Sequence, residues 1–232
     1  GLILLIIWTI ADWTTGWWKR RQLFTAIGAV ALTILALIAR TQASYWRDSE
    51  LLWSHAIAVT KDNAFAQASL ADLLLRRGRL DEAIVHCQEA LRVDPHNADA
   101  HNNLGLALLQ KGRESEAGAE FRKSLEIDSH QMNAATNLAW ILATSPDPAT
   151  RDGAKAVELA EDVVQHAGHP NAIVLRTLSA AYAEVGRFSD AINAAQVATE
   201  IAVAQGNNGL AEDLQRCINS YRMGMPLRVG SQ

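Results

Sequence analysis

A period of about 34 residues runs through the middle of the chain and limits its fold more than any other feature. The positions in step are Leu70, Leu104 and Leu138, then Gly78 and Gly112, and then Ala83 and Ala117. The segments ALRVDPHN (90–97) and SLEIDSHQ (124–131) match in phase, as does AIAVTKDN (56–63) one period earlier. A period of this length indicates units that each bury an apolar face against the next unit. We therefore expect a linear stack of similar units.

Small and large apolar residues recur within each period. Residues 64–97 place them at Leu70, Ala71, Leu74, Ala83, Cys87, Ala90 and Pro95. Residues 98–131 place them at Leu104, Gly105, Leu108, Ala117, Phe121 and Ser124. Small residues let two helices approach closely, and larger ones fill the space beside them. This pattern resembles the tetratricopeptide repeat (TPR), in which two antiparallel helices occupy about 34 residues. The resemblance implies an all-α fold, a right-handed TPR α-solenoid.

The solenoid is expected to contain about four repeats with a half-unit at each end. The boundaries are 41–63 for a half-repeat helix, 64–97, 98–131, 132–171 and 172–202 for the repeats within 64–202, and 203–232 for a capping helix and tail. The third repeat contains an insertion, TSPDPATRD, between its two helices. An amphipathic segment at 210–222 is expected to cover the last repeat, which would otherwise expose its apolar face.

The segment 1–40 has the composition of membrane segments. Leu23 to Ala39 contains no charge and no proline, and as a helix it extends about 26 Å, enough for a short span. It follows eleven apolar residues and a basic turn, so 1–40 is expected to hold a truncated first segment and a second one at about 23–39. Five of the seven tryptophans lie close by, at Trp8, Trp13, Trp17, Trp18 and Trp46. Such aromatic residues are typical of a membrane interface.

The cluster Lys19-Arg20-Arg21 predicts the orientation of this segment. Basic turns face the cytoplasm, so everything after Arg40 is expected outside it, with the chain integral to a bacterial-type inner membrane. Two alternatives are a signal peptide and a buried helical hairpin of a soluble protein. The first lacks a clear cleavage site after Ala39, and the second does not account for the tryptophans.

The remaining sequence is acidic. The segment 1–40 holds one acid and four bases, and removing these from the totals of 25 and 21 leaves 24 acids and 17 bases. Residues 41–232 therefore carry a net charge of about −7, which argues against nucleic acid as a partner. A protein or peptide ligand is expected instead, with no small-molecule substrate site evident.

No motif indicates catalysis or a cofactor. The two cysteines, Cys87 and Cys217, lack metal-binding spacing and are expected to fill helix interfaces. His86, His96 and His101 lie near Cys87 in sequence, but the helical positions do not bring these side chains together. Neither HExxH nor GxSxG occurs, and no glycine-rich phosphate loop is present. We expect no catalytic residue, no metal site and no cofactor.

The best candidate ligand-binding residues are Asn103 and Asn137, each one residue before a repeated leucine. One period apart, they are expected on the concave wall, beside Asn102, Asp72 and Gln110. An amide both donates to and accepts from a peptide group, which suits an extended chain of any sequence. The pair resembles the asparagine ladder of TPR regions in some protein O-glycosyltransferases. The alternative is that these asparagines only face solvent.

The whole arrangement also resembles the C-terminal end of a group of polytopic membrane enzymes. A membrane hairpin that leads through YWRDSELLW (45–53) into TPR units is similar to the transmembrane-and-TPR O-mannosyltransferases. In that family the catalytic acidic residues lie in an early loop with no counterpart here. The resemblance implies a non-catalytic part of a membrane glycosyltransferase, and the alternative is a stand-alone tethered scaffold in envelope assembly.

Overall fold

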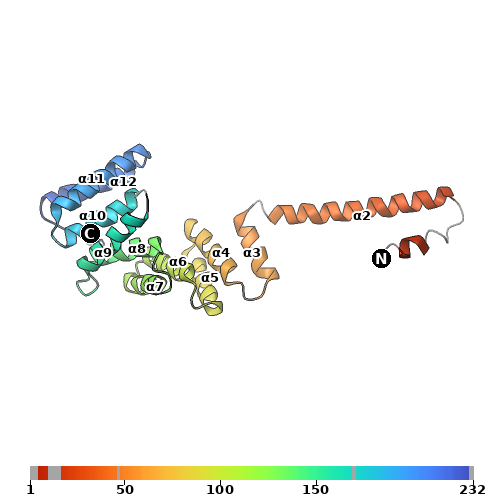
Figure 1. Cartoon of the computed structure of the whole chain (residues 1–232), viewed down its shortest axis with the longest axis horizontal. Coiled ribbons are helices and arrows are strands. Elements are labelled where there is room, and N and C mark those ends of the chain that lie inside the picture. Colours follow the sequence, from red (N-terminus) through yellow and green to blue (C-terminus); the bar gives the residue numbers. More distant parts are fainter. Residues whose placement is uncertain (1–4, 10–16, 46–47, 169–170, 230–232) are drawn as a thin grey trace. The chain divides into compact units, whose positions relative to one another are not determined.

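The computed structural model describes residues 5–9, 17–45, 48–168 and 171–229, which in these ranges form helices and connecting turns without any strand (Figure 1). The chain divides into two units, Gly1–His55 and Ala56–Gln232. Each unit is described by itself.

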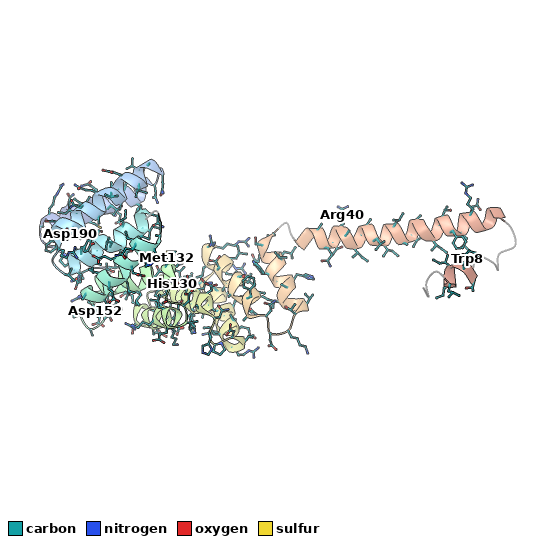
Figure 2. The ribbon with its side chains drawn as sticks, in the orientation of Figure 1. Trp8, Arg40, His130, Met132, Asp152 and Asp190 are labelled. Atoms are coloured by element: carbon teal, nitrogen blue, oxygen red, sulfur yellow. The ribbon has the colours of Figure 1, made fainter. Side chains whose placement is uncertain are left out.

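The first unit contains one long helix, α2, which spans Trp17–Tyr45. Within it, Arg21–Ala43 has a mean hydropathy of 2.2 and no buried residue, so it is long and apolar enough to cross a membrane. Figure 2 shows that the helix continues past Arg40, beyond the membrane span expected at about 23–39. The expected basic turn and the tryptophans Trp13 and Trp46 fall wholly or partly outside the described residues. Helix α3, Ser49–Val59, follows and ends in the second unit.

The second unit is a chain of helices that pack in consecutive pairs (Figure 1). They are α4 Ala64–Arg76, α5 Leu80–Val93, α6 Ala98–Gln110, α7 Glu114–Ile127, α8 Met132–Thr144, α9 Gly153–His166, α10 Ala172–Glu184, α11 Phe188–Ala204 and α12 Asn208–Arg222. The first helices of the pairs, α4, α6, α8 and α10, also contact one another and form one layer. The predicted all-α stack of helix pairs is confirmed.

Three of the turns inside the pairs share one design. Gly78, Gly112 and Gly186 have φ angles of 72°, 74° and 79°, a left-handed conformation that ends a helix at little cost for glycine. The next N–H then donates back to a helix carbonyl, as Arg79 N does to Leu74 O at 2.9 Å. Turns of this kind bring the second helix of each pair directly back along the first.

The first two helix pairs fill the same interface with side chains of different sizes. In the second pair, a Cβ on Gly105 would lie 2.7 Å from the ring of Phe121, which is completely buried. The equivalent residues one period earlier are Ala71 and Cys87, both also completely buried. A glycine thus makes room for a phenylalanine where an alanine faces a smaller thiol.

The third pair departs from this design through residues 145–152. Arg151 fixes the segment by donating from Nη1 to Ser145 O at 2.9 Å, and its Nε lies 3.1 Å from Glu184 Oε1. Asp152, labelled in Figure 2, caps α9 by accepting from Lys155 N at 3.0 Å. The insertion is therefore an ordered part of the solenoid.

The chain after α12 returns to this insertion. Arg228 Nη1 lies 2.6 Å from Glu184 Oε2, and Val229 N donates to Thr144 O at 3.0 Å. Helix α12, which covers the segment expected to be a cap, buries Leu214, Cys217, Ile218 and Tyr221 against the last pair. The return of the tail was not foreseen.

Candidate functional site

A groove of about 400 Å³ lies on the layer formed by α4, α6, α8 and α10. Polar side chains dominate its wall, and all five residues singled out from the sequence belong to it. These are Asp72, Asn102, Asn103, Gln110 and Asn137. Since the five lie on three different helices, the repeat brings together side chains that are far apart in the sequence.

Asn102 lines this groove and has an unused hydrogen-bond acceptor. Its side chain is only 7% exposed, and its Oδ1 has no partner. Its Nδ2 donates weakly to Asn103 Oδ1, at 3.4 Å. Because this oxygen is buried, a ligand N–H reaches it only if the Asn102 side chain turns toward the groove. The new hydrogen bond then removes the cost of an unpaired buried acceptor, about 1–3 kcal/mol.

Asn103 has a structural role that the sequence did not reveal. Its Nδ2 donates across the repeat boundary to Ala68 O at 3.3 Å, and the residue is 9% exposed. Asn103 therefore also joins two repeats, and its contribution to ligand binding stays a prediction. Asn137 is half-buried and makes no hydrogen bond within the described part of the protein, so both ends of its amide are available.

Three further polar residues that the sequence pattern did not single out line the groove. Asn133 lies one helical turn before Asn137 and is exposed, and Thr136 donates to Met132 O at 2.8 Å. Asn171 caps α10 by accepting from Val174 N at 3.0 Å. Asn133 could have been predicted from the sequence, because residues four apart, such as Asn133 and Asn137, lie on the same face of a helix.

The charges at the groove cancel. Asp72 accepts from Arg76 Nε at 2.9 Å on an exposed rim, and the other lining residues are uncharged. Neutral amides and hydroxyls form hydrogen bonds with a ligand but do not select for its net charge. The groove is therefore suited to main-chain groups more than to a carboxylate or an ammonium.

The cysteine and histidines considered for a metal site do not converge. Cys87 is completely buried, and burial raises the pKa of its thiol to about 12. His86 Nδ1 lies 2.6 Å from Gln67 Oε1, whereas His101 pairs with Glu120 and His96 lies exposed in a turn. Among the described residues, no group of three or more histidine, cysteine, aspartate or glutamate side chains could hold a metal ion.

Comparison with known proteins identifies the repeat. The tetratricopeptide repeat family model matches residues 68–131. Helices α4 to α12 form a solenoid whose fold resembles that of TPR proteins. A search of curated proteins found no match to the sequence.

Several solved TPR structures have a similar fold. YrrB, a TPR protein with an unusual peptide-binding site, is 17% identical with a TM-score of 0.54, over 74% of this chain and 92% of YrrB. A thermophilic TPR protein of Thermus thermophilus is 15% identical with a TM-score of 0.53, over 82% and 96%. MamA of Desulfovibrio magneticus RS-1 is 19% identical with a TM-score of 0.50, over 71% and 97%. At these identities the likeness shows the fold alone.

Proteins built from TPR units bind peptides or other proteins. The groove described above lies on the layer of first helices of the TPR pairs. These matches do not support the resemblance to membrane O-mannosyltransferases.

Proposed function

We propose that the TPR unit binds an extended, uncharged stretch of polypeptide in the groove, and that α2 anchors it to a membrane with the repeats outside the cytoplasm. The observation that carries the binding proposal is the unpaired, buried Oδ1 of Asn102 within a neutral, amide-lined groove.

A peptide main chain has the chemistry that this wall can satisfy. Each peptide unit offers one N–H and one C=O, and Asn102 Oδ1 accepts the first. Asn137, with both ends of its amide free, pairs with a peptide group further along. Such recognition depends little on side chains, so the scaffold accepts many sequences that lack secondary structure.

The membrane part of the proposal rests on α2 and on the basic cluster at its start. Arg21–Ala43 has the length and hydropathy of a span, and the positive-inside rule places the basic end in the cytoplasm. We further propose that the domain serves a membrane glycosyltransferase by holding acceptor proteins. Ten or so membrane spans with an acidic loop, encoded upstream of Gly1, would support this parent, and an immediate start codon would exclude it.

The groove is tested on the full chain in lipid nanodiscs. A random 12-residue display library supplies peptides, and their affinities are then measured for the wild type, Asn102→Ala, Asn137→Ala and the double variant. Loss of one or two hydrogen bonds should weaken binding by about 1–3 kcal/mol, or about 5- to 150-fold. Asn193→Ala is the matched control, because Asn193 is exposed on α11 and does not line the groove.

Thermal unfolding of each variant, followed by circular dichroism, separates binding from folding. Asn102→Ala and Asn137→Ala should retain the wild-type melting temperature because they break no strong contact. If the double variant holds the selected peptides as tightly as the wild type does, the amide groove is not the binding site.

A further inference from the structure

A second hollow, of about 780 Å³, adjoins the amide groove at Gln110, which lines both. We name it the side chamber and define it by the end of α6, the start of α7, Trp140, residues 145–150 and Val229. Leu109, Trp140 and Pro146 give it an apolar surface. Because Gln110 lines both, the chamber is a neighbour of the groove, within reach of a side chain of a peptide that passes Gln110.

The chamber owes part of its wall to segments that the regular repeats lack. Where other pairs turn in three residues, this pair uses the insertion 145–152, and the returning tail contributes Val229. Both segments are tied in place, because Arg151 and Arg228 each pair with Glu184, a carboxylate only 13% exposed. A wall fixed in advance loses little conformational entropy when a ligand enters, which favours binding.

The aromatic surface of the chamber belongs to Trp140. The Arg176 guanidinium lies over the Trp140 ring, 4.1 Å from its centroid, yet Arg176 does not line the chamber. The Trp140 ring thus already holds one cation, which belongs to a residue outside the chamber lining. Tryptophan attracts cations more strongly than the other aromatic side chains.

The charged groups of the chamber leave an acidic excess. Arg113 is paired with Glu116 at 2.6 Å. Glu114 accepts from Ser145 Oγ at 3.0 Å, and Asp147 accepts from Thr150 Oγ1 at 3.0 Å, but in the described part of the chain neither carboxylate pairs with a cation. Two negative charges beside a tryptophan complement a positively charged side chain.

We infer that the side chamber binds the lysine or arginine side chain of the peptide whose main chain occupies the amide groove. The inference rests on the proposed function, to which it adds a sequence preference. The aliphatic stem contacts Leu109 and Pro146, while the charged end reaches Trp140, Glu114 and Asp147. The scaffold thus selects uncharged extended stretches that carry one basic residue at a fixed place.

The test compares peptide selection on three forms of the full chain in nanodiscs. Peptides that bind are selected from a random 12-residue display library, separately for each of three targets. The targets are the wild type, Glu114→Gln/Asp147→Asn and Glu126→Gln/Glu158→Gln. Glu114→Gln keeps an oxygen that accepts from Ser145 Oγ. Asp147→Asn keeps one of the two oxygens that accept from Ala149 N and Thr150 Oγ1. The control removes the same charge from a different hollow, between α7 and α9. Lysine or arginine should be enriched at one aligned position for the wild type and the control, and not for the chamber variant.

A selected peptide and its norleucine analogue then give the size of the effect. The preference for lysine is the ratio of the affinities for the peptide and for its norleucine analogue. Glu114→Gln alone, or Asp147→Asn alone, should lower this ratio by about 1.5- to 5-fold, because each removes one carboxylate. Trp140→Leu should reduce it by about 2- to 5-fold, with circular dichroism as the check on folding.

The outcomes separate the two proposals. Peptides that bind through Asn102 and Asn137 but show no basic position would overturn the chamber and leave the groove intact. A lysine preference that survives Glu114→Gln/Asp147→Asn would do the same. If the library yields no peptide whose affinity depends on the groove asparagines, both proposals fail.

Discussion

His101 Nδ1 lies 2.6 Å from Glu120 Oε2, and this pair occupies the same two repeat positions as Gln67 and His86 one period earlier. Both pairs join the first helix of a repeat to the second across 19 residues, at the same distance of 2.6 Å. The His101 ring also lies between two acceptors, because its Nε2 is 3.2 Å from Pro95 O. A cross-helix hydrogen bond thus recurs with different chemistry in neighbouring repeats.

The equivalence of these pairs predicts that one can replace the other. His101→Ala leaves the largely buried Glu120 without its cross-helix partner, and should lower the free energy of unfolding by about 1.5–3 kcal/mol. The double change His101→Gln/Glu120→His installs the Gln67–His86 arrangement and should stay within about 1 kcal/mol of the wild type. Urea unfolding followed by circular dichroism measures both. A double variant less stable than His101→Ala would show that the two repeats are not interchangeable here.

The size exchange between Gly105–Phe121 and Ala71–Cys87 leads to a second prediction. Gly105→Ala places a methyl group 2.7 Å from the Phe121 ring, and overpacking of this kind costs about 1–3 kcal/mol. Alanine gains about 1 kcal/mol over glycine in a helix, so the net loss should be about 0–2 kcal/mol. Gly105→Ala/Phe121→Cys reproduces the first repeat, and should therefore recover close packing at this contact.

The comparison of three variants in the same unfolding experiment decides this point. Phe121→Cys alone leaves a cavity beside Gly105 and should be the least stable of the three. Equal stability of Phe121→Cys and the double variant would mean that the alanine does not fill the space.

The solenoid was predictable because its contacts are periodic. Leu70, Leu104 and Leu138 recur once in every repeat, and each is buried in the structure. Features that occur once leave no such signal. The contact of Val229 N with Thr144 O joins two segments far apart in the chain, and nothing in either local sequence indicates it.

The groove was predictable in outline for the same reason. Equivalent positions on successive first helices place Asn103 and Asn137 along one wall. The hydrogen bond from Asn103 to Ala68 O depends on how closely two repeats approach. Whether the Asn102 oxygen finds a partner depends in turn on the position of the Asn103 side chain in that bond. The side chamber depends on the path of the insertion, which a repeat pattern does not specify.

Both native cysteines should be inert toward thiol reagents at pH 8. Burial raises the pKa of Cys87 to about 12, so only about one molecule in ten thousand carries the reactive thiolate at that pH. Burial, with the charge of Asp213, also raises the pKa of Cys217. The folded chain should show almost no reaction with a maleimide or a disulfide reagent, and the denatured chain should show two thiols. Rapid labelling of the folded chain would contradict the packing of α5 or α12.

This inert background allows the membrane orientation to be tested with single added cysteines. Ala149 lies exposed in the insertion, and Thr15 belongs to the basic segment of the sequence outside the described residues. If that segment is cytoplasmic, Ala149→Cys should react with an impermeant maleimide on intact cells, because the repeats are then outside the cytoplasm. Thr15→Cys should react only after the cells are permeabilised. Denatured samples provide the full labelling value for each variant, and the chain without an added cysteine provides the zero. The opposite pattern would place the groove in the cytoplasm and remove secreted or surface polypeptides from the ligands that it can meet, while the binding chemistry of Asn102 and Asn137 would stand.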